Sequence, residues 1–360
     1  MNHRLTTIFA TKTYAADATE IIDINLSDPV SAFLFVFQMH ASTQDSMTLH
    51  PMACISKVEL VDGSDVLFSL TGLEMEALDW YNHKSFRFNE NFALIGNYVV
   101  RRVGINFGRF LWDPMFAFDP SKFKNPQLKI TVDLDGGGQT PTYVKVAVHA
   151  LCFDEKIVTP LGFFMSKEIK NYVPAAAGHE YTDLPTDFPY RKLLIKCQTA
   201  GSALDWLLSN IKLSEEQDKR VVFDQSPTDI MAAIMAEYPP VEESYYFACT
   251  GANTYLMIAP TFWVASTAAV WREAYLDSLV NLYSGNGGRL KTWAGPATAN
   301  YQIHVRGWLP HGVIAIPFGD QNDPDDWYDV TKIGSLKADI TAAGAATGGF
   351  QICLEQLRAY

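Results

Sequence analysis

The sequence predicts an all-β protein that contains two copies of one β-sandwich domain, with few and short helices. Three observations support this prediction: apolar and polar residues alternate with a period of two, turn residues separate the alternating runs, and the two halves of the chain repeat one another. Alternation of this kind marks strands with one face in a core and one face in water or an interface. Many short strands with Gly/Pro turns are typical of sandwiches and barrels.

The alternation is clearest in residues 127–134, where every second residue is apolar. The apolar positions there and in four further runs are Leu128, Ile130, Val132 and Leu134; Ile22, Ile24 and Leu26; Val144, Val146 and Val148; Tyr301, Ile303 and Val305; and Phe350, Ile352 and Leu354. Residues 32–37 do not alternate and predict a strand that is buried on both faces. Glycine-containing turns such as Asp62-Gly63 and Gly348-Gly349 separate the runs.

Helical periodicity is scarce. Residues 73–80 and residues 227–236 each predict about two helical turns, and residues 270–283 place apolar side chains at the spacing of one longer helix.

An internal repeat is visible between residues 58–78 and residues 211–234. Each stretch has a strand that ends in Phe, a Ser or Thr three residues later and an acidic residue after three more. These residues are Phe68, Thr71 and Glu74 in the first copy and Phe223, Ser226 and Asp229 in the second. A Ser or Thr followed three residues on by an acid is the pattern of a helix N-cap. Each copy therefore predicts strand, turn, strand and capped helix.

The ends of the two halves repeat as well. The matching segments, in order, are Ile105–Gly108 with Ile316–Gly319, Asp113-Pro114 with Asp323-Pro324, Asp119–Lys122 with Asp329–Lys332, and Leu128-Lys129 with Leu336-Lys337. The order of these matches predicts a first domain at residues 1–158 and a second at residues 159–360. The second copy is longer between its capped helix and this block, which predicts an insertion at about residues 238–301 that forms a partly structured outer decoration on the second domain.

The bulk composition agrees with two folded domains. The chain has 360 residues, of which 48% are hydrophobic and 19% charged. The formal net charge is −12 and the longest basic runs are pairs, such as Arg101-Arg102. A protein that neutralises phosphates needs a basic face, so we expect no direct sequence-specific binding of nucleic acid.

The cysteines and the N-terminal sequence indicate the cellular compartment in which the chain is synthesised. The five cysteines, Cys54, Cys152, Cys197, Cys249 and Cys353, are far apart and never in a CxxC spacing. They predict buried, reduced thiols that react slowly, without a disulfide framework or a zinc site. The N-terminus lacks the apolar core of a signal peptide and the apolar runs are too short to span a membrane. We therefore expect a chain that is synthesised soluble in the cytoplasm.

No enzymatic constellation is evident, so the sequence predicts no catalytic, cofactor-binding or metal-binding residues. GxSxG and HExxH are absent, and the eight histidines never fall at metal-binding spacing. His149 and His304 lie on the polar faces of strand-like runs and are interpreted as surface or interface residues. The run Gly285–Thr292 is interpreted as a glycine-rich turn. The aspartates from Asp320 to Asp329 are interpreted as a solvated turn, with calcium binding as the alternative.

The repeated block that contains INFG, DP, DPSK and LKI, together with FPYRKLLIKCQTAGSALDWLLSNIKLSEEQDKRVVFDQSP, resembles the double jelly-roll major capsid proteins. This lineage includes adenovirus hexon and the capsid proteins of tailless, membrane-containing bacteriophages. The resemblance implies two tandem eight-stranded antiparallel jelly rolls and a homotrimer whose six jelly rolls form a pseudo-hexameric tile of an icosahedral shell. It also implies loops between the middle strands that point away from the particle interior.

The partners and location that the resemblance implies are those of a virion. They are neighbouring capsomers, penton or spike proteins, minor capsid proteins and an internal viral membrane. The family has no catalytic residues to carry over.

Two other functional classes stay open for this fold. One is a carbohydrate- or receptor-binding protein, for which Trp293 and Trp308 are candidate stacking residues. The other is a cupin-type enzyme, which needs a cluster of His and Glu ligands whose spacing is not found.

Overall fold

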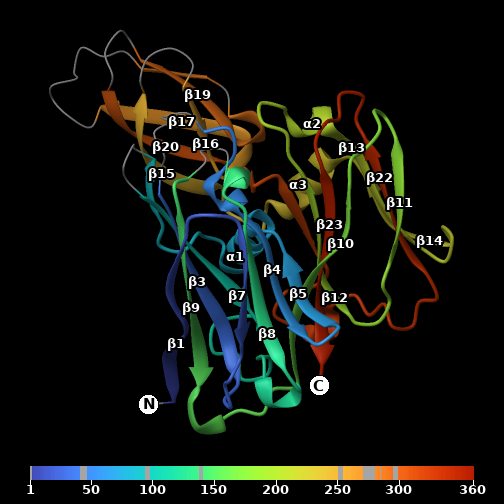
Figure 1. Cartoon of the computed structure of the whole chain (residues 1–360). Coiled ribbons are helices and arrows are strands. Elements are labelled where there is room, and N and C mark those ends of the chain that lie inside the picture. Colours follow the sequence, from blue (N-terminus) through green and yellow to red (C-terminus); the bar gives the residue numbers. More distant parts are fainter. Residues whose placement is uncertain are drawn as a thin grey trace.

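A computed structural model gives the structure of the chain. It describes residues 2–40, 47–93, 98–137, 141–249, 254–270, 280–283, 285–294 and 299–360. Figure 1 shows two β-sandwiches side by side and a further group of strands above the first of them. The N-terminus and the C-terminus both lie at the end of the molecule opposite this group (Figure 1).

The first sandwich is an eight-stranded jelly roll. Its strands are β1 (His3–Tyr14), β2 (Ala18–Asp23), β3 (Val30–His40), β4 (Ile55–Asp62), β5 (Asp65–Leu70), β7 (Tyr98–Asn106), β8 (Pro126–Val132) and β9 (Val144–Phe153). They pair in the orders β1-β9-β3-β7 and β2-β8-β4-β5. Within each order every pair is antiparallel, and the two groups of strands enclose a core.

The second sandwich repeats this topology strand for strand. Its strands are β10 (Gly162–Tyr172), β11 (His179–Leu184), β12 (Tyr190–Cys197), β13 (Leu208–Glu215), β14 (Arg220–Gln225), β21 (Val313–Pro317), β22 (Leu336–Ala342) and β23 (Phe350–Ala359). They pair in the orders β10-β23-β12-β21 and β11-β22-β13-β14, which are the orders of the first sandwich with each strand replaced by its counterpart. The predicted fold of two tandem jelly rolls is therefore confirmed. The division at residue 158 stays a prediction.

The predicted helix caps are confirmed at matching places in both copies. Helix α1 (Gly72–His83) begins after Thr71, whose side chain accepts from the backbone N–H of Glu74, and the Glu74 side chain accepts from the N–H of Thr71. Helix α3 (Pro227–Ile234) begins after Ser226, whose hydroxyl oxygen accepts from the N–H of Asp229. Each cap satisfies backbone donors that would otherwise lack a partner at the helix end.

The other described helices are short. They are α2 (Leu204–Leu207) and the 3-10 turns η1 (Pro51–Cys54), η2 (Pro120–Lys122), η3 (Asp135–Gly137), η4 (Asp154–Lys156), η6 (Asn286–Gly288) and η7 (Pro324–Asp326). The repeated Asp residues cap equivalent turns, because Asp119 accepts from the N–H of Ser121 and Asp329 from the N–H of Thr331.

The segment between α3 and β21 forms the group of strands above the first jelly roll, which we call the tower. Its strands are β15 (Val241–Cys249), β16 (Thr254–Met257), β17 (Pro260–Val270), β18 (Val280–Tyr283), β19 (Arg289–Ala294) and β20 (Ala299–Pro310). The helix predicted at residues 270–283 is wrong at both described ends, since Val270 closes β17 and β18 is a strand. Residues 271–279 lie outside the described residues. Strand β17 pairs with β20, and β18 pairs with β19. These strand pairings determine the structure of the two ends, although their apolar residues have helical spacing.

Two short parallel pairings join the copies into continuous sheets. Strand β5 of the first jelly roll pairs with β10 of the second at Phe68 and Ser166. Strand β6 (Glu90–Ala93), which lies between α1 and β7, pairs with β15 of the tower at Phe92 and Tyr246. The tower therefore belongs to the second copy in sequence but extends a sheet of the first copy in space, as Figure 1 shows.

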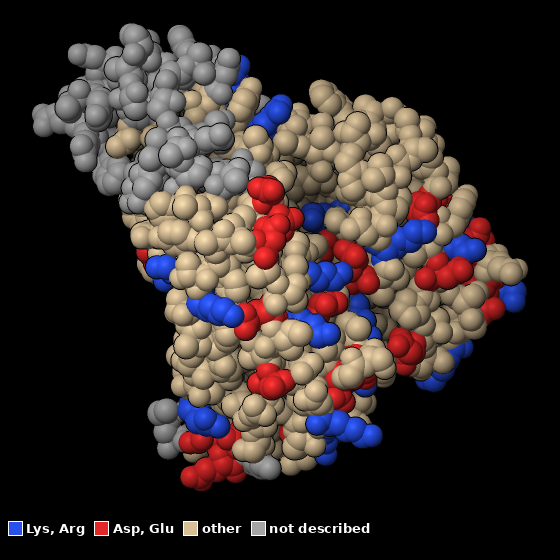
Figure 2. Space-filling view, viewed as in Figure 1, with Lys and Arg blue, Asp and Glu red and all other residues tan. Residues whose placement is uncertain are grey.

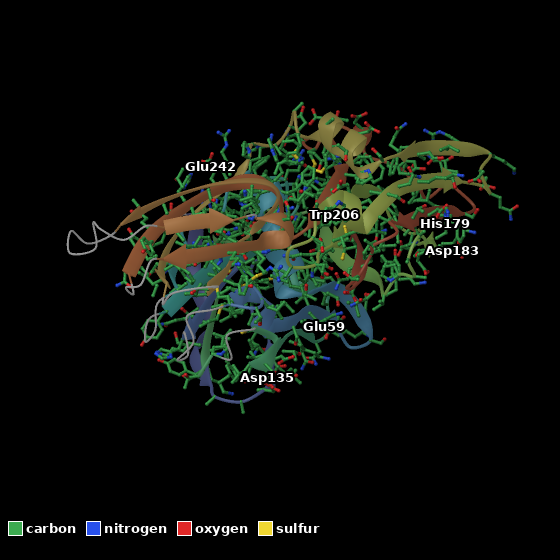
Figure 3. All side chains as sticks on the ribbon, turned by 90° about the horizontal axis from the view of Figure 1, so that it is seen from above. Glu59, Asp135, His179, Asp183, Trp206 and Glu242 are labelled. Atoms are coloured by element: carbon green, nitrogen blue, oxygen red, sulfur yellow. The ribbon has the colours of Figure 1, made fainter. Side chains whose placement is uncertain are left out.

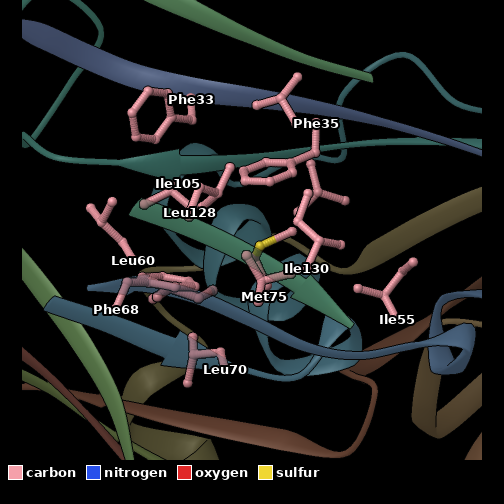
Figure 4. Close-up of a cluster of buried hydrophobic side chains, with 14 of the residues drawn as sticks. Phe33, Phe35, Ile55, Leu60, Phe68, Leu70, Met75, Ile105, Leu128 and Ile130 are labelled. Atoms are coloured by element: carbon pink, nitrogen blue, oxygen red, sulfur yellow. The ribbon is translucent and has the colours of Figure 1, made fainter. Parts of the chain in front are cut away.

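Figure 4 shows the core of the first jelly roll, where side chains from the two groups of strands meet. Phe33 and Phe35 of β3 lie on one side, and Leu60 of β4 lies on the other. The prediction that residues 32–37 are buried on both faces is wrong for Leu34 and Val36, which are half-buried. Burial on one face is sufficient here, because the fold places β3 in an antiparallel sheet rather than between two layers of helices.

Candidate functional site

The acidic cluster of the second jelly roll is built of turns. The carboxylates of Asp320, Asp323 and Asp326 accept hydrogen bonds from the backbone N–H groups of Asn322, Asp325 and Asp320, at 2.7–3.1 Å. All three aspartates are exposed. The arrangement stabilises the loop by local side chain to backbone bonds, as Asx turns do.

The glycine-rich run is a close-packed turn. A Cβ added at Gly287 would lie 1.9 Å from the carbonyl oxygen of Thr199, and the backbone φ of Gly287 is +59°. The Gln198 side chain donates to the carbonyl of Gly287 at 2.9 Å, and Asn286 accepts from the N–H of Gly201. This turn fastens the tower to the loop after β12.

The histidines that were interpreted as surface or interface residues form hydrogen bonds with hydroxyl groups. His149 Nδ1 lies 3.1 Å from the hydroxyl oxygen of Thr7 and is half-buried, whereas His304 is exposed and lies 3.2 Å from that of Ser244. His50 and His311 instead lie together inside the protein, with ring centroids 4.6 Å apart. Sequence spacing does not reveal this contact, because the two rings come from different halves of the chain.

Four cysteines, Cys54, Cys152, Cys197 and Cys353, are buried and free. Burial raises the pKa of Cys54 to about 12, of Cys152 to about 11 and of Cys197 to about 12. The thiolate is the reactive form, so these groups are held in the unreactive form. The side chain of Cys249 lies outside the described residues.

The two jelly rolls meet in a seam that contains a buried ionic network. Glu355 of β23 accepts from Arg191 and Lys192 of β12, with oxygen–nitrogen distances of 2.5 and 2.9 Å. Asn82 of α1 donates to the other carboxylate oxygen of Glu355 at 3.2 Å, and so connects the first copy to the second. Burial acts to raise the pKa of Glu355, but Lys192 and Arg191 lower it to about 2. The carboxylate is therefore charged and paired.

A second buried network connects the first jelly roll to the tower. Arg101 of β7 is fully buried and contacts Glu76 of α1 and Glu243 of β15, both at 2.6 Å. Glu76 also accepts from His311 in the turn between β20 and β21, at 2.9 Å. Burial acts to raise the pKa of Glu76, while Arg101 and His311 hold it below its usual value. Burial lowers the pKa of His50 well below its usual value.

A cleft of about 500 Å³ opens at the seam. The basic residues that line it include Arg109, Arg191 and Lys192. Arg109 is engaged by Asp113, with Nε and Oδ2 at 2.7 Å, and the other two are engaged by Glu355. Since these three cations already have carboxylate partners, the cleft does not offer them as a free set of charges for an anionic substrate.

Large apolar side chains are exposed at several separate places on the surface. Those that are more than half exposed are Leu5, Ile21, Phe88, Phe110, Leu161, Val173, Tyr181, Trp206 and Trp263. On the face that Figure 2 shows, acidic and basic side chains are interspersed, and the top of the second jelly roll is largely uncharged. Figure 3 shows Glu242 of the tower on the opposite side of the molecule from His179 and Asp183 of β11.

The tryptophans considered for sugar stacking do not form an exposed platform in the described residues. Trp308 is partly buried and packs against the core of the second jelly roll. The side chain of Trp293 lies outside the described residues. In the described part of the chain, no helix is both long and apolar enough to cross a membrane.

Neither a protein-family model nor a curated protein sequence matches the chain. Solved structures match it along nearly its whole length. A chain in the atomic structure of Sulfolobus turreted icosahedral virus is 12% identical with a TM-score of 0.60, and the match covers 100% of this chain and 92% of that one. The major capsid protein of bacteriophage PM2 is 11% identical with a TM-score of 0.55, over 99% of this chain and 98% of that one.

A third structure, the capsid of PBCV-1, contains a chain that is 11% identical with a TM-score of 0.54, over 99% of this chain and 94% of that one. The resemblance to double jelly-roll capsid proteins is therefore confirmed at the level of the fold.

Proposed function

We propose that this chain is a viral major capsid protein, whose homotrimers form the pseudo-hexameric tiles of an icosahedral shell. The observation that carries the proposal is the fusion of two jelly rolls with one topology, side by side, in a single chain. Three such chains around a three-fold axis present six jelly rolls, so that a trimer approximates six-fold packing. The similar structures named above include capsid proteins that share this fold over nearly the whole chain.

The surface supports a role in assembly. Tiling needs contacts within a trimer and contacts between trimers, and obligate interfaces of this kind bury roughly 2,000 Å² or more and are rich in apolar groups. Phe110, Leu161, Trp206 and Trp263 are exposed on the single chain. Burial of these side chains in subunit contacts would remove them from water.

The role we propose is structural rather than catalytic. The ionic networks of the described residues join strands and helices within the chain, and their carboxylates and cations are paired with one another. The other partners we propose are penton or spike proteins, minor capsid proteins and an internal viral membrane. We place synthesis in the host cytoplasm, which agrees with the four buried free thiols.

Native mass measurement tests the assembly. Light scattering of the purified chain should give a trimer of about 120 kDa, from chains of 40.1 kDa. Negative-stain images should show hexagonal outlines or shells. A stable monomer at micromolar concentration would contradict the proposal, and a small oligomer with affinity for glycans would support the carbohydrate-binding alternative.

We also propose that the tower forms the outer surface of the shell. Its strands stand at the end of the molecule opposite both termini (Figure 1). Limited proteolysis of intact particles, followed by mass mapping, should give cuts within residues 238–301. Cuts confined to the first jelly roll, with the tower on the inner surface in cryo-microscopy, would refute this placement.

A further inference from the structure

We propose that His50, Glu76 and His311 form a binding site for a first-row transition metal ion of the Zn²⁺ class. The ligand atoms of these three buried residues lie within 4.8 Å of one another. Two imidazoles and one carboxylate are a ligand set that Zn²⁺ takes in proteins. The sequence predicts no metal ligands, and the proposed site departs from that prediction because Glu76 and His311 are 235 positions apart.

The geometry needs only a small contraction. Nitrogen and oxygen ligands stand about 2.0–2.2 Å from Zn²⁺, so ligands at tetrahedral positions lie roughly 3.3 Å apart. His311 Nε2 and Glu76 Oε2 are 2.9 Å apart, and no two of the three ligand atoms are more than 4.8 Å apart. Each side chain therefore has to move by about 1 Å or less. Three protein ligands leave one position for water.

Two nitrogen atoms of the cluster have no hydrogen-bond partner in the described structure. They are His50 Nε2 and His311 Nδ1. Buried polar atoms are almost always paired, so each such atom needs an explanation. Coordination by a metal ion supplies a partner for His50 Nε2.

The charges of the cluster also favour a cation. Arg101 is the guanidinium that faces both Glu76 and Glu243, so two buried carboxyl groups share one guanidinium inside the protein. An unbalanced buried charge is costly. A divalent cation on Glu76 offsets this charge, and Arg101 then holds the carboxylate in place from its other oxygen atom.

Local backbone contacts position the two histidines before a metal ion binds. His311 has a φ of +53°, in the left-handed region, and its N–H donates to the carbonyl of Ala259 at 2.8 Å. His50 is the N-cap of η1, and its Nδ1 accepts from the N–H of Met52 at 3.3 Å. Metal binding at Nε2 moves the ring proton from Nε2 to Nδ1 and gives up this long hydrogen bond, with no net release of a proton from His50.

The site would connect three parts of the chain that are distant in sequence. His50 lies before η1, Glu76 lies on α1, and His311 lies in the turn that connects the tower to β21. A bound ion therefore fastens the tower and the second jelly roll to the first. Since a metal ion that binds only the folded state stabilises that state, its removal should lower the melting temperature.

Metal analysis of the untagged, full-length protein tests the inference. After incubation with Zn²⁺ and dialysis, the protein should retain about one Zn²⁺ per chain, and a strong chelator should lower its melting temperature by roughly 5 °C, reversibly. His50→Asn should lose at least nine-tenths of the metal while it stays folded, because Asn is a good N-cap residue that can accept from the N–H of Met52. His179→Asn, which changes an exposed histidine, is the matched control and should retain the metal.

Cobalt substitution keeps the test decisive if the variant fails to fold. Co²⁺ added to the wild-type protein should give the visible absorption of a tetrahedral site, saturating at one equivalent. Wild-type protein that retains less than a tenth of an equivalent of Zn²⁺ and shows no such absorption would overturn the proposal. Equal retention of metal by His50→Asn and the wild type would also overturn it. These readouts do not depend on whether the chain forms trimers.

Discussion

The hydroxyl of Tyr81 on α1, in the first copy, donates a hydrogen bond of 2.7 Å to the carbonyl oxygen of Val313, the first residue of β21 in the second copy. Both residues are buried. The bond joins positions 232 residues apart in the sequence, and it forms because the capped helix of one jelly roll lies against the other.

Removal of this hydroxyl should weaken the seam. Tyr81→Phe keeps the ring and deletes the donor, so the free energy of unfolding should fall by about 1–2 kcal/mol. Tyr181→Phe changes an exposed ring and should have an effect within about 0.5 kcal/mol. Denaturant unfolding followed by fluorescence measures both. Equal effects of the two substitutions would show that the seam contact contributes nothing.

Glu355 should make the protein sensitive to acid. Its pKa of about 2 lies below the ordinary value of 4.5, so its stabilisation is present above about pH 4.5 and is lost as the pH falls toward 2. The loss should be on the order of 3 kcal/mol. Unfolding measured from pH 6 to pH 2 gives this dependence.

The variant Glu355→Gln tests the source of that dependence. At pH 7 it should be destabilised by about 3–5 kcal/mol, because Arg191 and Lys192 lose their carboxylate partner. Its stability should also change less between pH 5 and pH 2 than that of the wild type. Glu242→Gln, which changes an exposed glutamate paired with Arg306, is the control and should keep the wild-type dependence. A Glu355→Gln variant with the wild-type dependence would assign acid sensitivity to other carboxylates.

The turn at Gly287 should tolerate no side chain. Gly287→Ala places a Cβ against the Thr199 carbonyl and at a positive φ, so it should lower the free energy of unfolding by about 1–3 kcal/mol. Proteolysis should then cut the tower faster. Gly344→Ala has open space around its Cβ and is the matched control. If both variants unfold at the same temperature, the turn does not fasten the tower.

The four buried thiols should react slowly in the native state. Cys54, Cys152, Cys197 and Cys353 are buried and have raised pKa values, so a thiol reagent at pH 8 should modify them many times more slowly in the folded protein than in denaturant. Mass mapping after timed quenching gives the rate at each site. Rapid modification of two or more of them in the folded protein would contradict their burial.

The sequence predicted the elements that depend on near neighbours. Thr71 and Ser226 cap helices because each side chain reaches a backbone N–H three residues on, and this relation is visible in the sequence. The helix prediction at residues 270–283 was wrong because the structure there depends on residues that are distant in the sequence. Helical spacing is a local signal, whereas β18 is a strand because β19 lies beside it.

The tower shows the same limit at a larger scale. The internal repeat showed that the second copy is longer, but it did not show that the tower pairs with the first jelly roll. Strand β15 pairs with β6, which comes from the first copy, and a parallel pairing of this kind leaves no pattern in either segment alone.

The sequence by itself determined the all-β class, the two copies and their caps, because periods of two and spacings of three residues follow from local backbone geometry. Only the tertiary structure decided which buried charges meet. Arg101 contacts Glu243, and His311 contacts Glu76, because sheets whose strands come from both halves of the chain pack together. Distances across such packing depend on the placement of every intervening strand, so no short segment of the sequence encodes them.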